Sequence, residues 1–440
     1  MMRKMERVWA LLGAATFVLT CTVAPTAGGA STPPGQDGFY SYTGRTSLQE
    51  IAPGTVLKTR TMPYHLFGLA LPLSATQLLY RSTDQLGQPT VNVTSIVRPP
   101  GKVNAARAVS YQSFYDSLNP ADEPSYAISG GTTIGGVIPN IELAVFGAFL
   151  LQGYSIIVPD TQGQGADFAA GPEYGMNTLD SIRAATRSSA TGLTAATKIG
   201  MIGYSGGAIA TGWAAALAPA YAPEVNRQLV GAAEGGVLVD PDHNLHYIDG
   251  SRVWAGVAPM ALIGISRAFH IDLTPYLSDY GKQLYAKLQD ASIISVLGAY
   301  GGLTWAKLAK PAYQRPESIP VFVHAANQLN MGSAPTPTVP MFIGQGANGI
   351  LEGTLGNKPG IGAGDGVMIA ADVRSLARQY CSHGTKVQYA QYDATSHFTS
   401  VAFWLPAAIS WLSQRFAGKL APQNCASIAP GNSLAPVPAP

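Results

Sequence analysis

A serine between two glycines, Ser205, marks the point where an apolar segment meets an alanine-rich one, and this junction constrains the fold more than any other feature. Residues 199–203 predict a short buried strand, and residues 208–217 predict a helix of small side chains. Gly203 and Gly207 let this strand and helix pass close together, which exposes the Ser205 hydroxyl at the end of the strand. The Gly-x-Ser-x-Gly pattern alone is weak evidence, because a chain of this length with 49 glycines is expected to contain roughly 0.4 such matches by chance. The strand before it and the helix after it make it informative.

The first 30 residues have the composition of an export signal. A basic start precedes an apolar run over residues 8–23, and proline and small residues follow. We therefore expect a secreted protein whose signal peptide, residues 1–30, is cleaved near Ala30, with Ala27 as a second candidate. Anchoring as a lipoprotein through Cys21 is the less favoured alternative, because the residue before it is bulkier than such sites usually carry. No later segment is an unbroken run of about 18 apolar residues, so we expect no transmembrane segment in the mature chain.

The charge balance argues against nucleic acid as a partner. The chain has 27 Lys and Arg residues against 25 Asp and Glu residues, and residues 1–30 hold three of the former and one of the latter. The mature chain is therefore balanced, at 24 of each, and has no basic excess to bind phosphates. Charged residues make up 12% of the chain, whereas soluble domains usually contain about 25%. An exported enzyme rich in alanine and glycine and a surface that meets lipid both fit this composition. No motif indicates a cofactor or a metal site, and we expect neither.

Two cysteines, Cys381 and Cys425, remain after removal of the signal peptide. Export places them in a compartment that permits oxidation, so we expect a disulfide between them that ties down the C-terminal segment. Two free buried thiols are the alternative.

Strand and helix patterns alternate along most of the chain. A hairpin at the edge of the sheet is predicted over residues 75–99, and residues 31–60 before it are predicted to be irregular. The alternation that follows predicts an α/β fold, with a mostly parallel sheet and crossover helices. The predicted strands are residues 108–114, 155–159, 199–203, 229–239, 340–344 and 387–392, and the predicted helices are residues 141–152, 177–188, 208–217, 367–380 and 403–416.

An insertion interrupts this alternation. Residues 240–318 lack strand character and carry aromatic residues and leucines at one-turn spacing, which predicts a helical cap over the carboxyl ends of the strands. The core then comprises residues 31–239 and 319–417. The aromatic side chains of the cap either fill its interior or also line a substrate tunnel. The tail, residues 418–440, is rich in proline and alanine and is expected to be disordered.

A serine hydroxyl becomes a nucleophile when an imidazole accepts its proton and a carboxylate orients that imidazole. In a fold with this turn, the order along the chain is serine, acid, histidine. His397 comes five residues after the predicted strand 387–392, and so is expected at the edge of the sheet where the serine lies. His383 precedes that strand and is expected at the opposite edge. His270 lies inside the predicted cap, and His324 lies in a loop without a clear pattern.

The acid is assigned by the same reasoning. The predicted strand 340–344 is followed by a Gly-rich excursion and then by Asp365, where a loop carboxylate at the carboxyl edge of the sheet can reach the histidine. Asp372 lies within a predicted helix, and Asp393 follows its own strand too closely. Glu352, inside the excursion, is the second candidate.

The reaction also needs hydrogen-bond donors for the oxyanion of its tetrahedral intermediate. The backbone N–H of Gly206, the residue after the serine, is expected to be one donor. The loop that follows the early predicted strand, within residues 108–117, is expected to supply the other.

Several short motifs around these residues are specific in combination. They are Ser110-Tyr111-Gln112, Asp116-Ser117, Pro124-Ser125-Tyr126, Val158-Pro159-Asp160, Gly203-Tyr204-Ser205-Gly206-Gly207, Asp365-Gly366-Val367 and His397. Over nearly all of the mature chain, the sequence resembles the secretory lipases of the α/β-hydrolase fold, the lipase A type. The resemblance implies an α/β-hydrolase sheet with an inserted helical lid, and hydrolysis of carboxylic esters, including triacylglycerols.

The resemblance also implies roles for single residues. It places a catalytic triad on Ser205, Asp365 and His397. It makes the side chain of Asp116 the second oxyanion donor, beside the N–H of Gly206. Asp116 donates only when it is protonated, which an apolar pocket permits.

Two features depart from the pattern of that family. Residues 345–364 form a long excursion between the predicted strand and Asp365. Phe398 follows the histidine, where a small residue is more usual, and is expected to narrow the site.

Three classes of function are compatible with these residues. The first is a secreted lipase or esterase that forms an acyl-enzyme on Ser205 and releases the acid with water. The second uses the same residues to pass the acyl group to an alcohol or a sugar; a peptidase is a further variant, although no feature marks a site for a peptide N-terminus. The third is a non-catalytic binding protein that has kept the fold. The expected partner is a small-molecule or lipid ester, with transient contact with a lipid interface.

Overall fold

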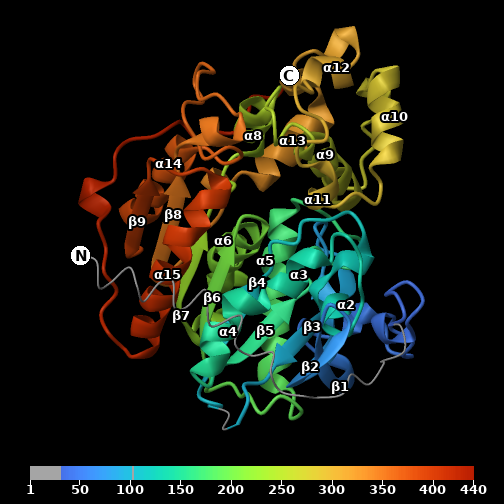
Figure 1. Ribbon diagram of the computed structural model, residues 1–440, viewed down its shortest axis with the longest axis vertical. Helices are drawn as coiled ribbons and strands as arrows, with labels where there is room; N and C mark the ends of the chain where they lie inside the picture. The colour runs from blue at the N-terminus through green and yellow to red at the C-terminus, as the bar shows by residue number, and fades with distance from the viewer. Residues whose placement is uncertain (1–30, 102–103) are drawn as a thin grey trace.

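A nine-stranded sheet forms the centre of the molecule. The computed structural model describes residues 31–101 and 104–440, and the predicted signal peptide, residues 1–30, lies outside them. Within these ranges the strands are β1 (Val56–Leu66), β2 (Leu69–Thr83), β3 (Pro89–Val97), β4 (Arg107–Gln112), β5 (Ser155–Pro159), β6 (Lys198–Tyr204), β7 (Leu229–Gly235), β8 (Met341–Gly346) and β9 (Val387–Tyr392). Their order is β1-β2-β3-β5-β4-β6-β7-β8-β9 (Figure 1). All pairs from β5 to β9 are parallel, which confirms the predicted α/β class.

The antiparallel part of the sheet has one more strand than the sequence predicted, and that strand forms the edge. β2 and β3 form the predicted hairpin, in which Gln77 lies opposite Ser95. This hairpin is not at the edge, because β1 pairs with the outer side of β2. Residues 56–60 belong to β1, so the expectation of an irregular segment over 31–60 is wrong there. Most of β1 is half-buried or exposed and it contains Pro63, which is tolerated on an edge strand, so its sequence lacks a clear strand pattern.

Helices cover both faces of the sheet. They are α2 (Pro124–Ile128), α3 (Val137–Ile141), α4 (Leu143–Leu151), α5 (Gly171–Arg187), α6 (Gly206–Tyr221), α7 (Pro223–Asn226), α8 (Pro241–Ile248), α9 (Val257–Ala268), α10 (Asp279–Lys287), α11 (Ile293–Val296), α12 (Trp305–Leu308), α13 (Pro320–Leu329), α14 (Ala370–Ser382) and α15 (His397–Phe416). Along β6, Ile199 and Met201 pack toward α5, α6 and α14, whereas Ile202 and Tyr204 pack toward α4 and α15. Of the helices in the described ranges, none has both the length and the apolar character needed to cross a bilayer.

The segment between β7 and β8 builds most of a second apolar cluster, to which residues 118, 168–169 and 361–371 also contribute. The helices α8 to α13 lie here, together with short 3-10 turns, and bury Trp254, Ile263, Val296 and Ile319 among other side chains. In Figure 1 they stand together at one end of the sheet. This arrangement fits the expected helical cap, whose boundaries at residues 240 and 318 stay a prediction.

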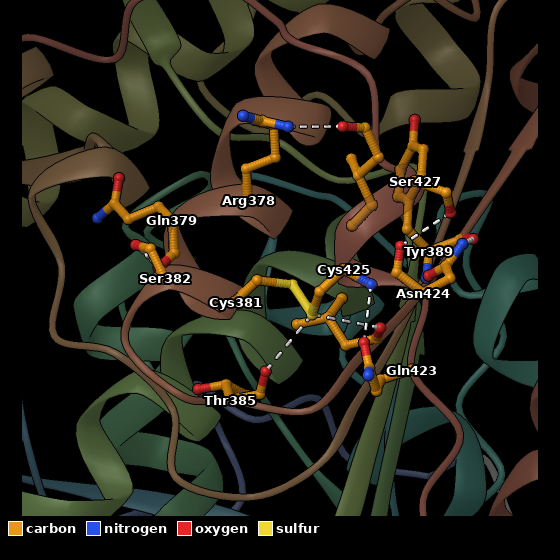
Figure 2. Close-up of a disulfide and its surroundings, with 12 residues drawn as sticks. Arg378, Gln379, Cys381, Ser382, Thr385, Tyr389, Gln423, Asn424, Cys425 and Ser427 are labelled. Atoms are coloured by element: carbon orange, nitrogen blue, oxygen red, sulfur yellow. Dashed lines mark hydrogen bonds between the residues drawn. A yellow bond between two sulfur atoms is a disulfide. The ribbon is translucent and has the colours of Figure 1, made fainter.

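The C-terminal tail, residues 418–440, is held against the body of the protein rather than disordered. Cys381 and Cys425 form a disulfide that joins the end of α14 to the tail (Figure 2). Further along, the carbonyl of Ile428 accepts a hydrogen bond of 2.7 Å from the guanidinium of Arg378. The composition, rich in proline and alanine, predicted disorder, but the backbone carbonyls of the tail accept hydrogen bonds from side chains of α14.

Candidate active site

Ser205 occupies the turn between β6 and α6 in a strained backbone conformation. Its φ is 54° and its ψ is −121°, and a positive φ is costly for a residue other than glycine. The two glycines of the motif permit this turn: a Cβ on Gly203 would lie 2.1 Å from the carbonyl oxygen of Gly207, and one on Gly207 would lie 2.1 Å from that of Gln112. The Ser205 side chain is thereby turned away from the packed strand, and the residue is only half-buried.

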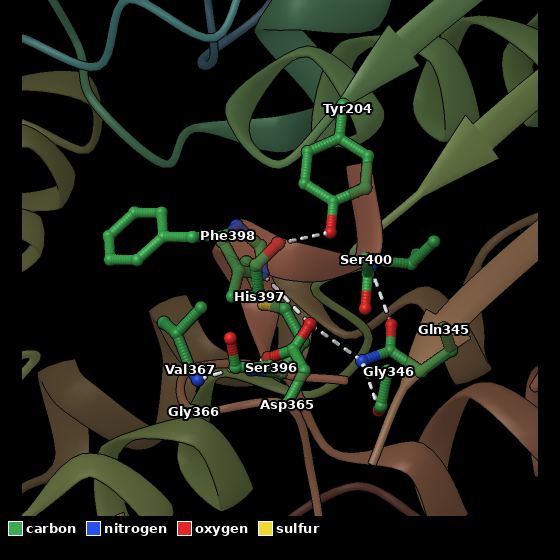
Figure 3. A network of polar contacts seen from close by, with 12 residues as sticks. Tyr204, Gln345, Gly346, Asp365, Gly366, Val367, Ser396, His397, Phe398 and Ser400 are labelled. Carbon is green, nitrogen blue, oxygen red and sulfur yellow. Dashed lines mark hydrogen bonds and ion pairs between the residues drawn. The ribbon is translucent and has the colours of Figure 1, made fainter. Parts of the chain in front are cut away.

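The imidazole of His397 is paired with the carboxylate of Asp365. Nδ1 of His397 lies 2.8 Å from Oδ2 of Asp365 (Figure 3). The other carboxylate oxygen accepts the backbone N–H groups of Val367 and Met368, and Oδ2 also accepts the amide of Gln345 at 2.8 Å. Because every lone-pair direction of the carboxylate is used, its orientation toward the imidazole is set.

The Asp365 carboxylate also sets the proton affinity of the imidazole. His397 is 2% exposed, and this burial lowers its pKa, but the charge and hydrogen bond of Asp365, with smaller contributions from Glu352 and Asp116, raise it by more. The net result is a pKa above the usual value for histidine. Nε2, the other ring nitrogen, is buried and makes no hydrogen bond within the described residues, so it remains available to accept a proton.

The ends of β6 and β7 both approach His397. The hydroxyl of Tyr204 donates a hydrogen bond of 2.7 Å to the carbonyl of His397 (Figure 3). The backbone N–H of Ser205 donates to the carbonyl of Gly235, and a Cβ on the next residue, Gly236, would lie 2.6 Å from Cε1 of His397. The ends of β6 and β7 and the start of α15 therefore meet at one place. The structure contains no hydrogen bond between the Ser205 hydroxyl and the imidazole.

His397 is the first residue of α15 rather than part of a loop before a later helix. The hydroxyl of Ser396 accepts the N–H of Thr399, and Thr399 reciprocates at the N–H of Ser396, so α15 begins at His397 and not near residue 403. The start of a helix holds the imidazole more rigidly than a loop does.

Asp116 is buried against the turn that carries Ser205. A Cβ on Gly206 would lie 1.8 Å from Oδ1 of Asp116, so the carboxyl and this backbone are in contact. Burial, with a smaller contribution from the charge of Glu142, raises the pKa of Asp116 to about 8, against an opposing effect of His397. At pH 7 the group is therefore mainly the neutral acid, which can donate a hydrogen bond.

The Asp116 loop is also joined to the helices between β7 and β8. The carbonyl of Asp116 accepts the N–H of Ile293, and the N–H of Leu118 donates to the carbonyl of Ala291, both at 2.8 Å. This contact spans more than 170 residues of sequence. The local sequence of neither segment predicts it.

Glu352, the second candidate for the acid, does not contact the imidazole ring through a hydrogen bond. Its two oxygens accept the N–H of Phe398 at 2.9 Å and the indole N–H of Trp254 at 2.7 Å. The ring of Trp254 packs edge-on against His397 and stacks with Phe398. Sequence analysis did not identify this contact of Trp254 with the imidazole. The contact forms because two insertions, residues 240–318 and residues 345–364, lie against each other.

The other histidines lie elsewhere. His383 is exposed and contacts Thr336, and His324 is exposed beside Gln328. His270 has a positive φ of 52° in the segment after α9. Of the downstream histidines that the sequence analysis weighed, His397 is the one paired with a buried carboxylate next to Ser205.

Comparison with known proteins identifies the family. Residues 130–358 and 360–424 match the family model described as secretory lipase, which is more than half of the chain. The chain belongs to the secretory lipase family. This lipase is therefore a carboxylic ester hydrolase with the α/β-hydrolase fold.

Individual relatives and structures agree with this assignment. Lipase 5 of Candida albicans is 30% identical over 427 residues, which cover 94% of this chain and 88% of that protein. A protein of Mycobacterium tuberculosis, named as a probable inactive lipase, is 30% identical over 394 residues, with 88% and 83% covered. The lipase is also similar in structure to Candida antarctica lipase A in its closed state, with a TM-score of 0.79, 24% identity and 93% of each chain covered. This structural likeness shows the fold.

Proposed function

We propose that this lipase is a secreted serine hydrolase that cleaves carboxylic esters, including triacylglycerols, through an acyl-enzyme on Ser205. The observation that carries the proposal is the buried pair of His397 and Asp365, whose ring nitrogen Nε2 is free beside the strained Ser205 turn. A serine at such a turn next to an oriented imidazole is the arrangement that acyl transfer requires.

In the first half of the reaction, Oγ of Ser205 attacks the ester carbonyl carbon while its proton passes to Nε2 of His397. The imidazolium that forms is stabilised by Asp365, which stays ionised. The tetrahedral intermediate then collapses: the bond to the alcohol oxygen breaks, and the alcohol leaves with the proton from Nε2. In the second half, water attacks the acyl-enzyme by the same steps and the carboxylic acid is released.

The oxyanion of each tetrahedral intermediate accepts hydrogen bonds from the backbone N–H of Gly206 and from the neutral carboxyl of Asp116. The contact between these two groups and the raised pKa of Asp116 support this assignment. Donors aimed at the position where charge develops lower the barrier by about 3–4 kcal/mol each.

The absence of a Ser205–His397 hydrogen bond fits a resting enzyme, because catalytic hydrogen bonds often tighten only when substrate binds. Rotation of the Ser205 side chain toward Nε2 on substrate binding completes the triad.

Secretion forms part of the proposal. The predicted signal peptide, residues 1–30, would be removed near Ala30, and the disulfide between Cys381 and Cys425 fits an oxidising compartment.

The test compares the wild type with Ser205→Ala on p-nitrophenyl esters of increasing acyl length. We expect Ser205→Ala to lower kcat by about 10⁴ to 10⁶-fold, because loss of the nucleophile leaves only binding and oxyanion contributions. A fluorophosphonate should label the wild type on Ser205 and should not label the variant. Equal rates for the two proteins would remove Ser205 from the mechanism. Failure of the probe to label Ser205 would favour a non-catalytic protein, a result that the relative named as a probable inactive lipase makes informative.

Acyl transfer is the second candidate function, and the burial of His397 beneath Trp254 favours it, because a dry site disfavours water as acceptor. Product analysis with a competing alcohol separates the two. A preference for the new ester over the free acid at low alcohol concentration would identify a transferase.

A further inference from the structure

The start and the end of the segment between β7 and β8 lie close together, and three side chains of types that commonly bind metals meet there. Asp242 and His246 are four residues apart on α8, so they share one face of that helix. Glu317 lies in a 3-10 turn, Pro316–Ser318, just before α13. Nε2 of His246 is 2.7 Å from Oε1 of Glu317 and 4.0 Å from Oδ1 of Asp242. The three ligand atoms all lie within 4.8 Å of one another.

Asp242 has a carboxylate oxygen without a partner. The residue is 7% exposed, and its Oδ1, which faces Nε2 of His246, is buried and makes no hydrogen bond within the described residues. A buried carboxylate oxygen without a donor is costly, and the second carboxylate nearby, Glu317, adds repulsion. Oδ1 of Asp242 is therefore a buried acceptor without a donor in contact with it.

The cations closest to this group are engaged elsewhere or too far away. The Lys358 ammonium donates to the backbone carbonyls at the end of α8, among them that of Asp249 at 2.6 Å. His243 is paired with Asp372 at 3.0 Å. Arg315 approaches Glu317 only to 3.9 Å, and its side chain is 83% exposed. None of these groups supplies a charge between the carboxylates of Asp242 and Glu317.

We propose that Asp242, His246 and Glu317 bind one zinc ion. Zinc takes imidazole nitrogen and carboxylate oxygen at about 2.0–2.2 Å in a tetrahedral arrangement, which separates ligand atoms by about 3.3 Å. The observed separations of 2.7 and 4.0 Å lie on either side of that value, so small side-chain movements bring the ligands into place. The imidazole favours zinc over calcium or magnesium, which take oxygen ligands. His246 is 39% exposed, which leaves its side of the site open for water as fourth ligand.

The zinc ion would have a structural role. It links the first helix after β7 to the turn that precedes α13, and so closes the base of this segment. The same helix contacts the Asp365 loop, because the amide of Asn244 donates to the carbonyl of Val367. Sequence analysis expected no metal, since Glu317 is 71 residues from His246 and its own sequence indicates nothing.

The test measures zinc binding, so its failure leaves the proposed hydrolase mechanism untouched. The full mature protein is freed of metal with a chelator and titrated with zinc chloride against a chromophoric competitor. We expect one zinc per chain in the wild type. His246→Ala and Asp242→Asn should each weaken binding at least tenfold. His383→Ala, which removes an exposed imidazole that contacts Thr336 and is not part of the group, should leave binding unchanged.

Cobalt provides a second measurement, because Co²⁺ in a site with few ligands absorbs visible light more strongly than hydrated Co²⁺. The wild type should show these bands and Asp242→Asn should lose them. Asp242→Asn keeps the shape of the side chain. It therefore still tests whether this group binds zinc if His246→Ala does not fold. The proposal is overturned if the wild type binds less than one zinc per chain, or if Asp242→Asn binds zinc and cobalt as the wild type does.

Discussion

Single residues in the site owe their chemistry to burial as much as to their type. Asp116 and Asp365 are both buried aspartates within the same site, yet only Asp365 is surrounded by donors: two backbone N–H groups, the Gln345 amide and the His397 ring. The Asp116 carboxylate accepts one long hydrogen bond, from the amide of Gln162 at 3.5 Å, and burial raises its pKa to about 8. Different surroundings can thus fit two aspartates of one site for the two tasks that the proposed mechanism gives them, oxyanion donor and orienting group.

The pH dependence of kcat should reveal the protonation of Asp116. Its pKa is raised, so the donating acid is present below about pH 8 and is lost as the pH rises through that value. The wild type should therefore lose activity above about pH 8. At the acidic end, activity should fall as His397, whose pKa is also raised, becomes protonated and no longer accepts the serine proton.

Asp116→Asn and Asp116→Ala separate this explanation from others. The asparagine amide donates at every pH, so Asp116→Asn should keep more activity than Asp116→Ala and lose the alkaline decline. Asp116→Ala should lower kcat by about 10² to 10³-fold. Circular dichroism at each pH checks that the fold is intact. An alkaline decline that persists in Asp116→Asn would assign it to another group.

The acid of the triad can be tested against its closest alternative. Asp365→Asn keeps the size of the side chain but allows the wrong tautomer of His397, so kcat should fall by about 10⁴-fold. Glu352→Gln should lower kcat by less than about tenfold and mainly reduce stability, by about 1–3 kcal/mol, because its amide cannot accept from both Trp254 and Phe398. Steady-state kinetics and urea unfolding of both variants provide the comparison. A larger loss of kcat in Glu352→Gln would make Glu352 the orienting acid.

At the scale of elements, close packing around β6 keeps the Ser205 turn in its strained form. β6 lies between β4 and β7 in the parallel part of the sheet, and α6 follows it directly. Gly207 lies against the backbone of Gln112 at the end of β4, and Gly235 of β7 contacts Trp404 of α15. The strain at Ser205 persists because these neighbours leave no room for a relaxed turn.

Alanine substitutions at two glycines, one closely packed and one in open space, test this packing. Gly207→Ala would place a Cβ 2.1 Å from the carbonyl oxygen of Gln112, so we expect a loss of about 2–4 kcal/mol in the free energy of unfolding, together with loss of activity. The matched control is Gly147→Ala in α4, where a Cβ meets no atom within 4 Å. That change should stabilise the protein by up to about 1 kcal/mol, since alanine favours a helix interior. Equal effects in urea unfolding would show that the close approach at Gly207 is unimportant.

At the scale of the whole molecule, segments remote in sequence hold one another. The Asp116 loop is bonded to Ile293 of the helical segment between β7 and β8, and the tail is bonded to α14. The disulfide between Cys381 and Cys425 closes a loop with a sequence separation of 44. These links make the cap, the core and the tail one structure.

Removal of the disulfide should loosen the tail first. The double variant Cys381→Ala, Cys425→Ala should lower the free energy of unfolding by about 2–4 kcal/mol, because the unfolded chain regains the entropy of the open loop. Limited proteolysis should then cleave the tail after residue 417 before the core, and esterase activity should largely remain. The oxidised wild type is the control. Resistance of the variant to tail cleavage would show that the hydrogen bonds from α14 suffice.

Structural features that depend on residues close together in the chain could be predicted from the sequence. The turn at Ser205 follows from its glycines and from the apolar strand before it, and the alternation of strands and helices indicated the parallel sheet. His397 could be selected by its distance from a strand end, although the capping by Ser396 and Thr399 that makes it the first residue of a helix was overlooked. β1 was also missed, since an exposed edge strand has little apolar pattern.

The amino-acid sequence by itself determined the fold class and the position of the Ser205 turn, because backbone preferences and apolar periodicity act over short distances in the chain. Only the tertiary structure decided the neutral state of Asp116, the cover of Trp254 over His397, the ordered tail, and the meeting of Asp242, His246 and Glu317. Each of these depends on loss of water or on contacts between groups far apart along the chain. Such effects arise only once the chain has folded.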